Sequence, residues 1–232
     1  MMAHQEPMTG TSLRTPRAAA AAGIVFSLLL GLALVLLIIS APSDTATEGA
    51  WLTDTSQRAT IALALNLVPF AGIAFLWFIG VVRDRIGQRE DRFFASVFLG
   101  SGLLFVAMLF TAAAFAGGLI AVTGVRSSAA PGPDTLAVGR QVTGLLLRVY
   151  AMRMAAVFTM STATITLRTQ LVPRWIGLTG IAVAVVLLVT LGFSPWVELL
   201  FPAWILLLSV DILRTGLRGS PSVTRTAADT QT

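Results

Sequence analysis

The sequence predicts an all-α membrane protein with six transmembrane helices in one bundle and both termini in the cytoplasm. Of the 232 residues, 56% are hydrophobic and 12% are charged, whereas about a quarter of residues are charged in soluble globular domains. Apolar runs of about 18 residues or more, enough to cross a bilayer as a helix, recur along the chain. The arginines gather in the short segments between these runs, as they do in cytoplasmic loops.

The apolar runs and their flanking charges define the predicted elements. A polar leader at residues 1–17 and a polar tail at residues 214–232 flank the transmembrane domain at residues 18–213. The predicted helices are residues 18–41, 60–82, 93–123, 142–167, 176–193 and 196–213. The first run is 24 residues long, which exceeds the about 7–15 apolar residues of a signal peptide, so we expect it to be retained as a helix.

Local signals modify the middle of this scheme. Pro69 removes one backbone hydrogen bond and is expected to kink the second helix. The third helix is longer than a perpendicular crossing needs, which predicts a tilt or a break near Gly117 and Gly118. The segment at residues 124–140, with the sequence VRSSAAPGPD in it, is expected to be a flexible exposed loop.

Small residues stand four apart in the predicted third helix. This spacing lets a neighbouring helix approach closely, although the alternative is that Ala and Gly are simply common in the proteome. The pairs are Ser96 with Gly100, Ala113 with Gly117, and Ala114 with Gly118.

The distribution of arginine predicts the topology. All sixteen basic residues are Arg, and eleven of them lie in the leader, the second loop, the fourth turn and the tail. The first and third loops hold three, and two lie within the fourth helix. The positive-inside tendency then places both termini in the cytoplasm. The use of Arg rather than Lys, together with abundant Ala, Gly and Val, indicates a G+C-rich bacterial genome and hence the bacterial plasma membrane.

Composition excludes several kinds of chemistry. The chain has no Cys, which excludes disulfides, thiolate catalysis and iron–sulfur ligation, and its single His is His4 in the leader. A bundle without His cannot hold haem through two histidines or build a His-based zinc site. No phosphate-binding loop, zinc-protease motif, nucleophile elbow or aspartate cluster is present. We therefore expect no cofactor and no metal, lean against an enzyme, and expect no nucleic-acid partner because the net charge of +5 is spread over short turns.

Two arginines within the fourth apolar run most need an explanation. A charged side chain at mid-membrane costs about 2.5–3.5 kcal/mol on insertion scales and needs compensation. On a regular helix Arg148 lies on a strip that is expected to face the bundle interior, and Arg153 lies about 140° away on a second strip. The first strip comprises Arg148, Met152, Ala155, Thr159, Thr162 and Thr166.

Two interpretations of these arginines stay open. In the first, the helix begins later, near Val149, and both arginines snorkel to the outer headgroups or pair with an acid. Glu198, near the start of the sixth helix, is the natural partner for Arg148. In the second, Arg153 lies near mid-membrane beside Asn66 and Tyr150 and faces a cavity that takes an anion or a lipid headgroup. The candidate ligand or structural polar residues are Arg148, Arg153, Asn66, Glu198 and Tyr150, and no catalytic, cofactor-binding or metal-ligating residue is predicted.

The turn between the fourth and fifth predicted helices, LRTQLVPRWIGLTGIAVAV, resembles a pattern in uncharacterised six-helix bacterial membrane proteins of the domain-of-unknown-function type. In those proteins a long helix ends in a basic turn, followed by Pro-Arg and a Gly-containing helix. The residues that carry the resemblance are Arg168, Pro173, Arg174, Trp175 and Gly177. The resemblance covers a minor part of the chain, implies a fold and a location, and supplies no activity.

The predicted function is that of a non-enzymatic accessory or regulatory membrane subunit that works through helix–helix contacts. Its expected partners are the lipid bilayer and either a second copy or another membrane protein. The alternatives are a small transporter or a lipid- or anion-binding protein that uses the intramembrane arginines, and a membrane-embedded enzyme. A cavity that reaches Arg153 would favour the former alternative, and a tightly packed bundle with an open face of small residues would favour the subunit.

Overall fold

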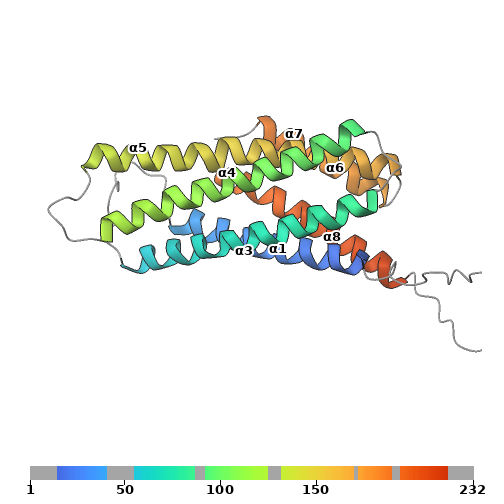
Figure 1. Cartoon of the computed structure of the whole chain (residues 1–232), viewed down its shortest axis with the longest axis horizontal. Helices are drawn as coiled ribbons and strands as arrows, with labels where there is room; N and C mark the ends of the chain where they lie inside the picture. Colours follow the sequence, from blue (N-terminus) through green and yellow to red (C-terminus); the bar gives the residue numbers. More distant parts are fainter. Residues whose placement is uncertain are drawn as a thin grey trace, which may run out of the picture.

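The computed structural model describes residues 15–40, 55–86, 92–124, 132–169, 172–189 and 194–218, and within them the regular structure is entirely helical (Figure 1). A π-helical segment, η3, joins two of the helices into one, and a 3-10 turn, η4, precedes the last helix. In chain order the elements are α1 (Thr15–Ser40), α3 (Thr55–Ile86), α4 (Arg92–Gly124), α5 (Pro133–Gly144), η3 (Leu145–Ala151), α6 (Met152–Thr169), α7 (Arg174–Val189), η4 (Pro195–Leu199) and α8 (Leu200–Arg218).

Among the residues that the structure describes, five helices are long and apolar enough to cross a membrane, which confirms the prediction of a helical, membrane-type chain. The fifth predicted crossing corresponds to α7, an apolar helix of 16 residues. Its length is about 24 Å, whereas a perpendicular crossing needs about 20 residues, or about 30 Å. Its predicted end at residue 193 lies outside the described residues, so the count of six crossings stays a prediction.

The helices extend further than the sequence predicted. The largest difference is α5, which occupies residues 133–144 where an exposed loop was expected up to residue 140. Gly132 is extended, Pro133 occupies the start of the helix and Asp134 lies in its first turn, which are the usual residues of a helix N-terminus. The leader up to residue 14, the first loop at residues 41–54 and the tail from residue 219 lie outside the described residues.

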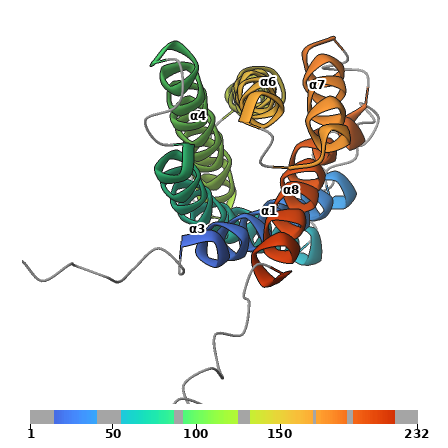
Figure 2. The same ribbon diagram turned by 90° about the vertical axis from the view of Figure 1, so that its right-hand side faces the viewer.

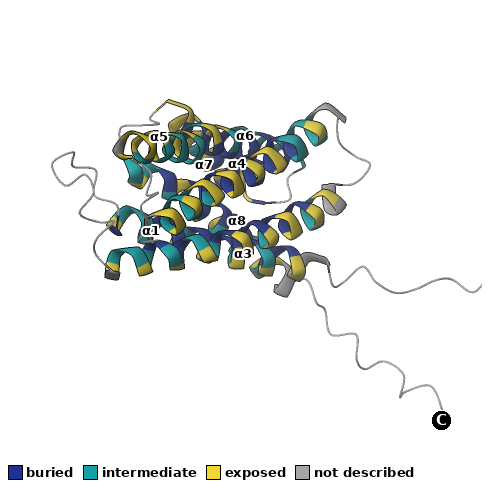
Figure 3. Cartoon of the chain, turned by 60° about the vertical axis from the view of Figure 1, so that its left-hand side comes forward, coloured by how far each residue is buried: buried dark blue, intermediate teal, exposed yellow. Residues whose placement is uncertain are grey.

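The helices pack in a closed ring. Each neighbouring pair is in contact in the order α1, α3, α4, α6, α7, α8 and back to α1, and the view along the ring shows this arrangement (Figure 2). Buried residues lie on the sides of the helices that face one another, and exposed residues lie on the outer sides (Figure 3). The ring therefore has one apolar interior and an apolar outer surface suited to lipid.

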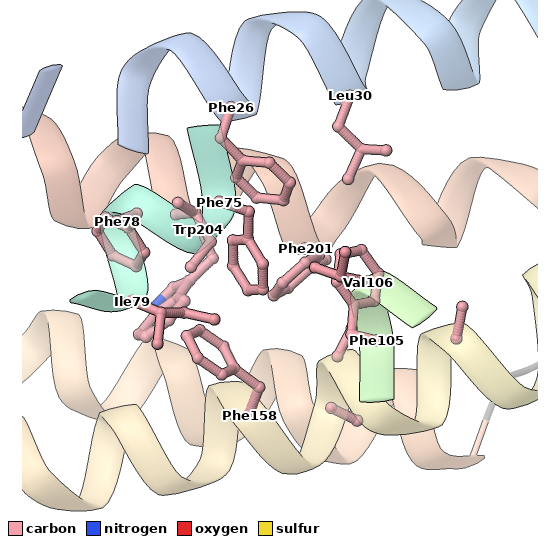
Figure 4. Close-up of a cluster of buried hydrophobic side chains, with 14 of the residues drawn as sticks. Phe26, Leu30, Phe75, Phe78, Ile79, Phe105, Val106, Phe158, Phe201 and Trp204 are labelled. Carbon is pink, nitrogen blue, oxygen red and sulfur yellow. The ribbon is translucent and has the colours of Figure 1, made fainter. Parts of the chain in front are cut away.

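Phenylalanines fill the middle of the ring. Five fully buried rings come from five different helices: Phe26, Phe75, Phe105, Phe158 and Phe201 (Figure 4). The ring centroid of Phe75 lies 4.5–5.9 Å from those of the other four. All four pairs are edge-on or tilted, and edge-on packing is an arrangement that aromatic quadrupoles favour. Because lipid tails solvate apolar side chains as well as protein does, the cluster stabilises the ring chiefly through close packing.

Close backbone approach holds α7 in the ring. A Cβ atom on Gly180 would lie 2.5 Å from Cζ2 of Trp204 in α8 and 2.9 Å from Cβ of Ala163 in α6, and Gly177 meets α6 in a similar way. Trp204 is buried and donates its indole N–H to the carbonyl oxygen of Ile176 at 3.1 Å. The glycines of α7 thus allow three helices to meet without a gap.

The inward strip predicted for the fourth crossing is buried, with the exception of Arg148. Each of its threonine hydroxyls donates to a carbonyl oxygen three or four residues earlier in the same helix, at 2.8–2.9 Å. These hydroxyls are satisfied within α6 and need neither water nor a ligand. The buried members are Met152, Ala155, Thr159, Thr162 and Thr166.

Candidate functional site

Arg148 and Glu198 meet at the level where α8 begins. Nε of Arg148 lies 3.7 Å from Oε1 of Glu198, the distance of an ion pair rather than of a hydrogen bond. The side chain of Glu198 is 7% exposed and that of Arg148 is 47% exposed. Arg148 therefore approaches from the surface of the ring, and the carboxylate lies among packed helices.

Glu198 lies at the start of a helical segment. Ser194 is extended, Pro195 follows it, and the N–H of Val197 donates to the carbonyl oxygen of Ser194 at 3.3 Å. Glu198 thus lies in the first turn of the helical segment formed by η4 and α8. The positive end of a helix dipole stabilises a negative charge at this position, in addition to Arg148.

The π-helical segment η3 determines how Arg148 is placed. A π turn contains more residues than an α turn, so it changes the angular position of the residues before it relative to those after it. On a regular helix Arg148 and Met152 would share one strip, but Met152 is fully buried and Arg148 is half-exposed. Single π turns inside α-helices occur frequently at functional sites, and the sequence reasoning did not predict this one.

Arg153 and Tyr150 lie on the outer surface of the ring. Tyr150 is 54% exposed, and Arg153, three residues later, is exposed as well. In the part of the chain that the structure describes, Arg153 has no carboxylate within ion-pair distance. Its side chain does not turn toward the buried threonines or the phenylalanine cluster, so the interpretation in which it faces an interior cavity gains no support.

Asn66 is separated from the other candidates. It lies on α3, which packs mainly on α1 and α4. Its side chain is exposed, and its Nδ2 donates to the carbonyl oxygen of Ala62, one turn earlier in the same helix, at 2.9 Å. The structure therefore brings Arg148 to Glu198, places Tyr150 and Arg153 on the adjoining surface, and leaves Asn66 elsewhere.

The two ends of the fourth crossing are marked by arginines. Arg148 and Arg168 are twenty residues apart in one continuous helix, which corresponds to about 30 Å. This length equals the thickness of the hydrocarbon core of a bilayer. Both arginines lie within the candidate membrane span Asp134–Thr169.

Aromatic side chains mark the same two levels. Trp196 is exposed two residues from Glu198, and the guanidinium of Arg168 lies 4.5 Å from the ring centroid of Phe94 at the other end. Trp175, which follows the turn after Arg168, is exposed too. Tryptophan and arginine are residue types that are enriched at membrane interfaces.

Beyond the level of Arg148, part of the structure continues. Helices α3, α4 and α5 extend past the level where α8 begins (Figure 1). A Cβ atom on Gly139 of α5 would lie 2.6 Å from Cδ2 of Leu119 of α4, so these two helices stay in close contact there. Fifteen residues of helix, 133–147, precede Arg148, or about 22 Å at roughly 1.5 Å per residue.

The acidic residues in the described part of the chain do not cluster into a second site. Asp211, the other acid of α8, is thirteen residues from Glu198, about 20 Å along the helix. Its Oδ2 is buried and has no hydrogen-bond partner in the described part of the chain. Within those residues no group of three His, Cys, Asp or Glu side chains could hold a metal ion.

Removal of Arg148 and removal of Glu198 should lower the free energy of unfolding by different amounts. We expect Arg148→Met to lower the free energy of unfolding by about 1–2 kcal/mol, less than the about 3–5 kcal/mol of fully buried pairs because Arg148 is half-exposed. Glu198→Gln should have a smaller effect, because the free guanidinium can reach the headgroups. The double variant should be more stable than the sum of the single losses predicts, measured by SDS titration of the detergent-solubilised protein. Additive losses would contradict the pairing.

Comparisons with protein-family models, with curated proteins and with solved structures found no match. The resemblance of the turn between α6 and α7 to six-helix bacterial membrane proteins therefore stays a prediction.

Proposed function

We propose that the protein is a non-enzymatic accessory or regulatory subunit of a bacterial plasma membrane, with six crossings and both termini in the cytoplasm. It works by packing an open face of α4 against a transmembrane helix of another membrane protein. This open face comprises Gly100, Ala107, Thr111, Ala114, Gly118 and Ala121. The observation that carries the proposal is that Ala107, Ala114 and Ala121 are exposed and that no described neighbour lies within 4 Å of a Cβ atom on Gly100 or Gly118.

The glycines of the helices fall into two groups. In the first group, a Cβ atom would collide with a side chain of another helix, so the absence of a side chain is needed for internal packing; its members are Gly23, Gly72, Gly102, Gly139, Gly177 and Gly180. In the second group no atom lies within 4 Å of the Cβ position; Gly100, Gly117 and Gly118 of α4 belong to it, with Gly31, Gly80 and Gly144. The internal packing of this chain explains the first group only.

The glycines of the second group that lie in α4 are the ones that a partner outside this chain would best explain. Glycine in a helix interior is less favourable than alanine by about 1 kcal/mol. Gly100, Ala107, Ala114 and Ala121 recur every seven residues, a spacing that keeps small residues on one side of a helix. Association of helices in lipid depends on close packing at such small residues, because lipid gives no hydrophobic driving force.

Arginine supports the orientation. The ends of α3, α6 and α8 lie together at one end of the ring (Figure 1), and they carry Arg83, Arg168 and Arg214. The positive-inside tendency favours the cytoplasm for this end. The end with Arg148 and Glu198 then faces the outer leaflet.

A larger side chain on the open face should abolish partner binding. Gly118→Leu should remove a stoichiometric membrane-protein partner from the protein purified out of its native membrane, because the added side chain keeps the two backbones apart. The variant itself should stay folded, since nothing in the chain lies within 4 Å of the Cβ position and leucine favours helix more than glycine does. The measurement is quantitative mass spectrometry of the purified complex.

Gly80→Leu is the matched control. Gly80 is an exposed glycine of α3 with an open Cβ position, and it lies outside the open face of α4. This variant should keep the partner. Retention of the partner by Gly118→Leu would contradict the proposal, and so would self-association as the sole interaction.

A further inference from the structure

We propose that two copies of this chain associate in the membrane through the outer stripe of α3, and that their two Asn66 side chains hydrogen-bond to each other. The outer stripe lies on the side of α3 that faces away from the ring (Figure 3). It is separate from the open face of α4, so this inference does not rest on the partner proposed above. The outer stripe comprises seven exposed residues: Ala59, Leu63, Asn66, Phe70, Ile73, Trp77 and Gly80.

Asn66 has hydrogen-bonding groups that the chain does not use. One N–H of its Nδ2 donates to the carbonyl oxygen of Ala62 at 2.9 Å. Within the described part of the chain, its second N–H has no acceptor and its Oδ1 has no donor. Because Asn66 is exposed on the outer side, this donor and this acceptor are available to a group outside the chain.

Asn66 lies within the apolar crossing of α3. The candidate span is Ser56–Arg83, 28 residues long. A crossing needs about 20 residues, and every stretch of that length within this span contains Asn66. Asn66 is therefore inside the crossing wherever the bilayer surface lies along the span.

Contacts with α4 support this depth. Gly72 of α3 packs against Phe110 of α4, and Ile79 packs against Gly102, so the two helices are antiparallel. Asn66 is six residues before Gly72, which is the level of a residue about six positions after Phe110. That level lies inside the candidate span of α4.

The amide of asparagine suits a second copy. Lipid tails offer no hydrogen bond, and an unpaired polar group among them costs free energy. An amide has both donors and an acceptor, so the free N–H of each Asn66 can donate to the Oδ1 of the other. A two-fold axis brings the same residue of both copies together. In the described part of α1, by contrast, the exposed residues are all apolar, as Val25, Leu28 and Leu32 show.

The spacing of the outer stripe matches two helices that pack along their length. Its members are alternately four and three residues apart, the spacing of the seam between the helices of a left-handed coiled coil, the hand of most membrane bundles. Copies of one chain insert in the same orientation, so their α3 helices are parallel and identical positions of the seam meet. A single asparagine in such a seam fixes the register of the two helices.

The association should be weak. Hydrogen bonds between helices contribute modestly to association in a membrane, and this interface has one polar pair. We expect the dimer to form in the bilayer and to dissociate on dilution into detergent. Its detection therefore requires vesicles.

The test measures energy transfer between copies of the full-length protein in phosphatidylcholine vesicles. A Thr232→Cys protein carries a donor or an acceptor fluorophore on its one thiol, since the chain has no cysteine of its own. Energy transfer should rise with the protein-to-lipid ratio and should depend on the fraction of acceptor as a dimer does. Energy transfer no higher than that of randomly distributed copies would overturn the proposal.

Variants in this labelled protein test the role of Asn66. Asn66→Leu should raise the dissociation constant of the dimer about tenfold, because two interhelical hydrogen bonds are lost. It should stay folded, since the amide makes its one hydrogen bond within α3. Asn66→Gln keeps an amide and should give a smaller loss. Leu178→Ala, on the exposed side of α7 across the ring, should associate like the parent protein. An unchanged dissociation constant for Asn66→Leu, or an equal loss with Leu178→Ala, would overturn the proposal.

Disulfide formation identifies the helix at the interface. With an added oxidant, Phe70→Cys as the only thiol should give disulfide-linked dimers in the same vesicles, and Leu178→Cys should not. Cross-linking at Leu178 in place of Phe70 would assign the association to another face and overturn the proposal. Asn66→Leu should leave the partner of α4 bound, so a failure of the dimer and a failure of the proposed function are distinguishable.

Discussion

Replacing Phe75 by alanine should lower the free energy of unfolding by about 3 kcal/mol, the low end of the about 3–5 kcal/mol that Phe→Ala changes cause in protein cores. Phe75 is fully buried and contacts four other rings of the central cluster. We expect the low end because the lost contribution is packing, and lipid offers no transfer term comparable to that of water. SDS titration of the detergent-solubilised protein, followed by tryptophan fluorescence, measures the loss.

The same helix provides the control for Phe75. Phe70 lies on α3 as well, but its side chain is 63% exposed on the outer side. Phe70→Ala should therefore change the stability little. Similar losses for the two variants would mean that the phenylalanine cluster is not the packed centre of the ring.

Two alanine substitutions of glycine should change stability in opposite directions. Gly180→Ala should destabilise the protein by about 1–3 kcal/mol, the usual effect of overpacking. The added Cβ would lie 2.5 Å from Trp204 and 2.9 Å from Ala163, so α6, α7 and α8 would have to move apart. Gly80→Ala meets no atom within 4 Å and should stabilise its helix by up to about 1 kcal/mol.

Thermal unfolding of the two variants in the same detergent checks this pair. Gly180→Ala should also change the emission of Trp204, because its indole N–H would lose the carbonyl oxygen of Ile176. If the two variants shift the unfolding midpoint in the same direction, the division of the glycines into two groups is wrong.

Much of the fold could be predicted from the sequence, because its signals are long and repeated. Apolar runs of sufficient length predict membrane helices whatever the tertiary contacts are. The 100° rotation per residue correctly placed Thr159, Thr162 and Thr166 on the buried side of α6. Depth along two helices also indicated Glu198 as the partner of Arg148, and the structure brings these two side chains together.

The environment of the arginines could not be predicted in full. The projection of a helix assumes a constant rotation, and the π turn of η3 interrupts it directly before α6. Arg148 is therefore half-exposed although its predicted strip is buried. The sequence LLLRVYA contains neither Gly nor Pro, so composition did not predict the π turn. For α5, the start signal of Pro133 and Asp134 was present and was masked by the loop-like composition before it.

Glycine shows the limit of spacing arguments. Gly100 and Gly102 are two residues apart in α4, and both lie next to Ser101 in an otherwise apolar stretch. A Cβ atom on Gly102 would collide with side chains of α3 and α6, whereas Gly100 meets nothing within 4 Å. Spacing of four identified Gly100, Gly117 and Gly118, and only the packed structure shows that Gly102 is used internally and Gly100 is left open.

A scan of single cysteines along residues 96–121 of α4 tests the central claim most directly. The chain has no cysteine of its own, so each variant carries one thiol for cross-linking in the native membrane. The account predicts that cross-links to a second membrane protein peak at Gly100, Ala107, Ala114 and Ala121 and vanish at buried positions such as Leu109. Cross-linking without this seven-residue period, or cross-links between copies of this chain alone, would contradict it.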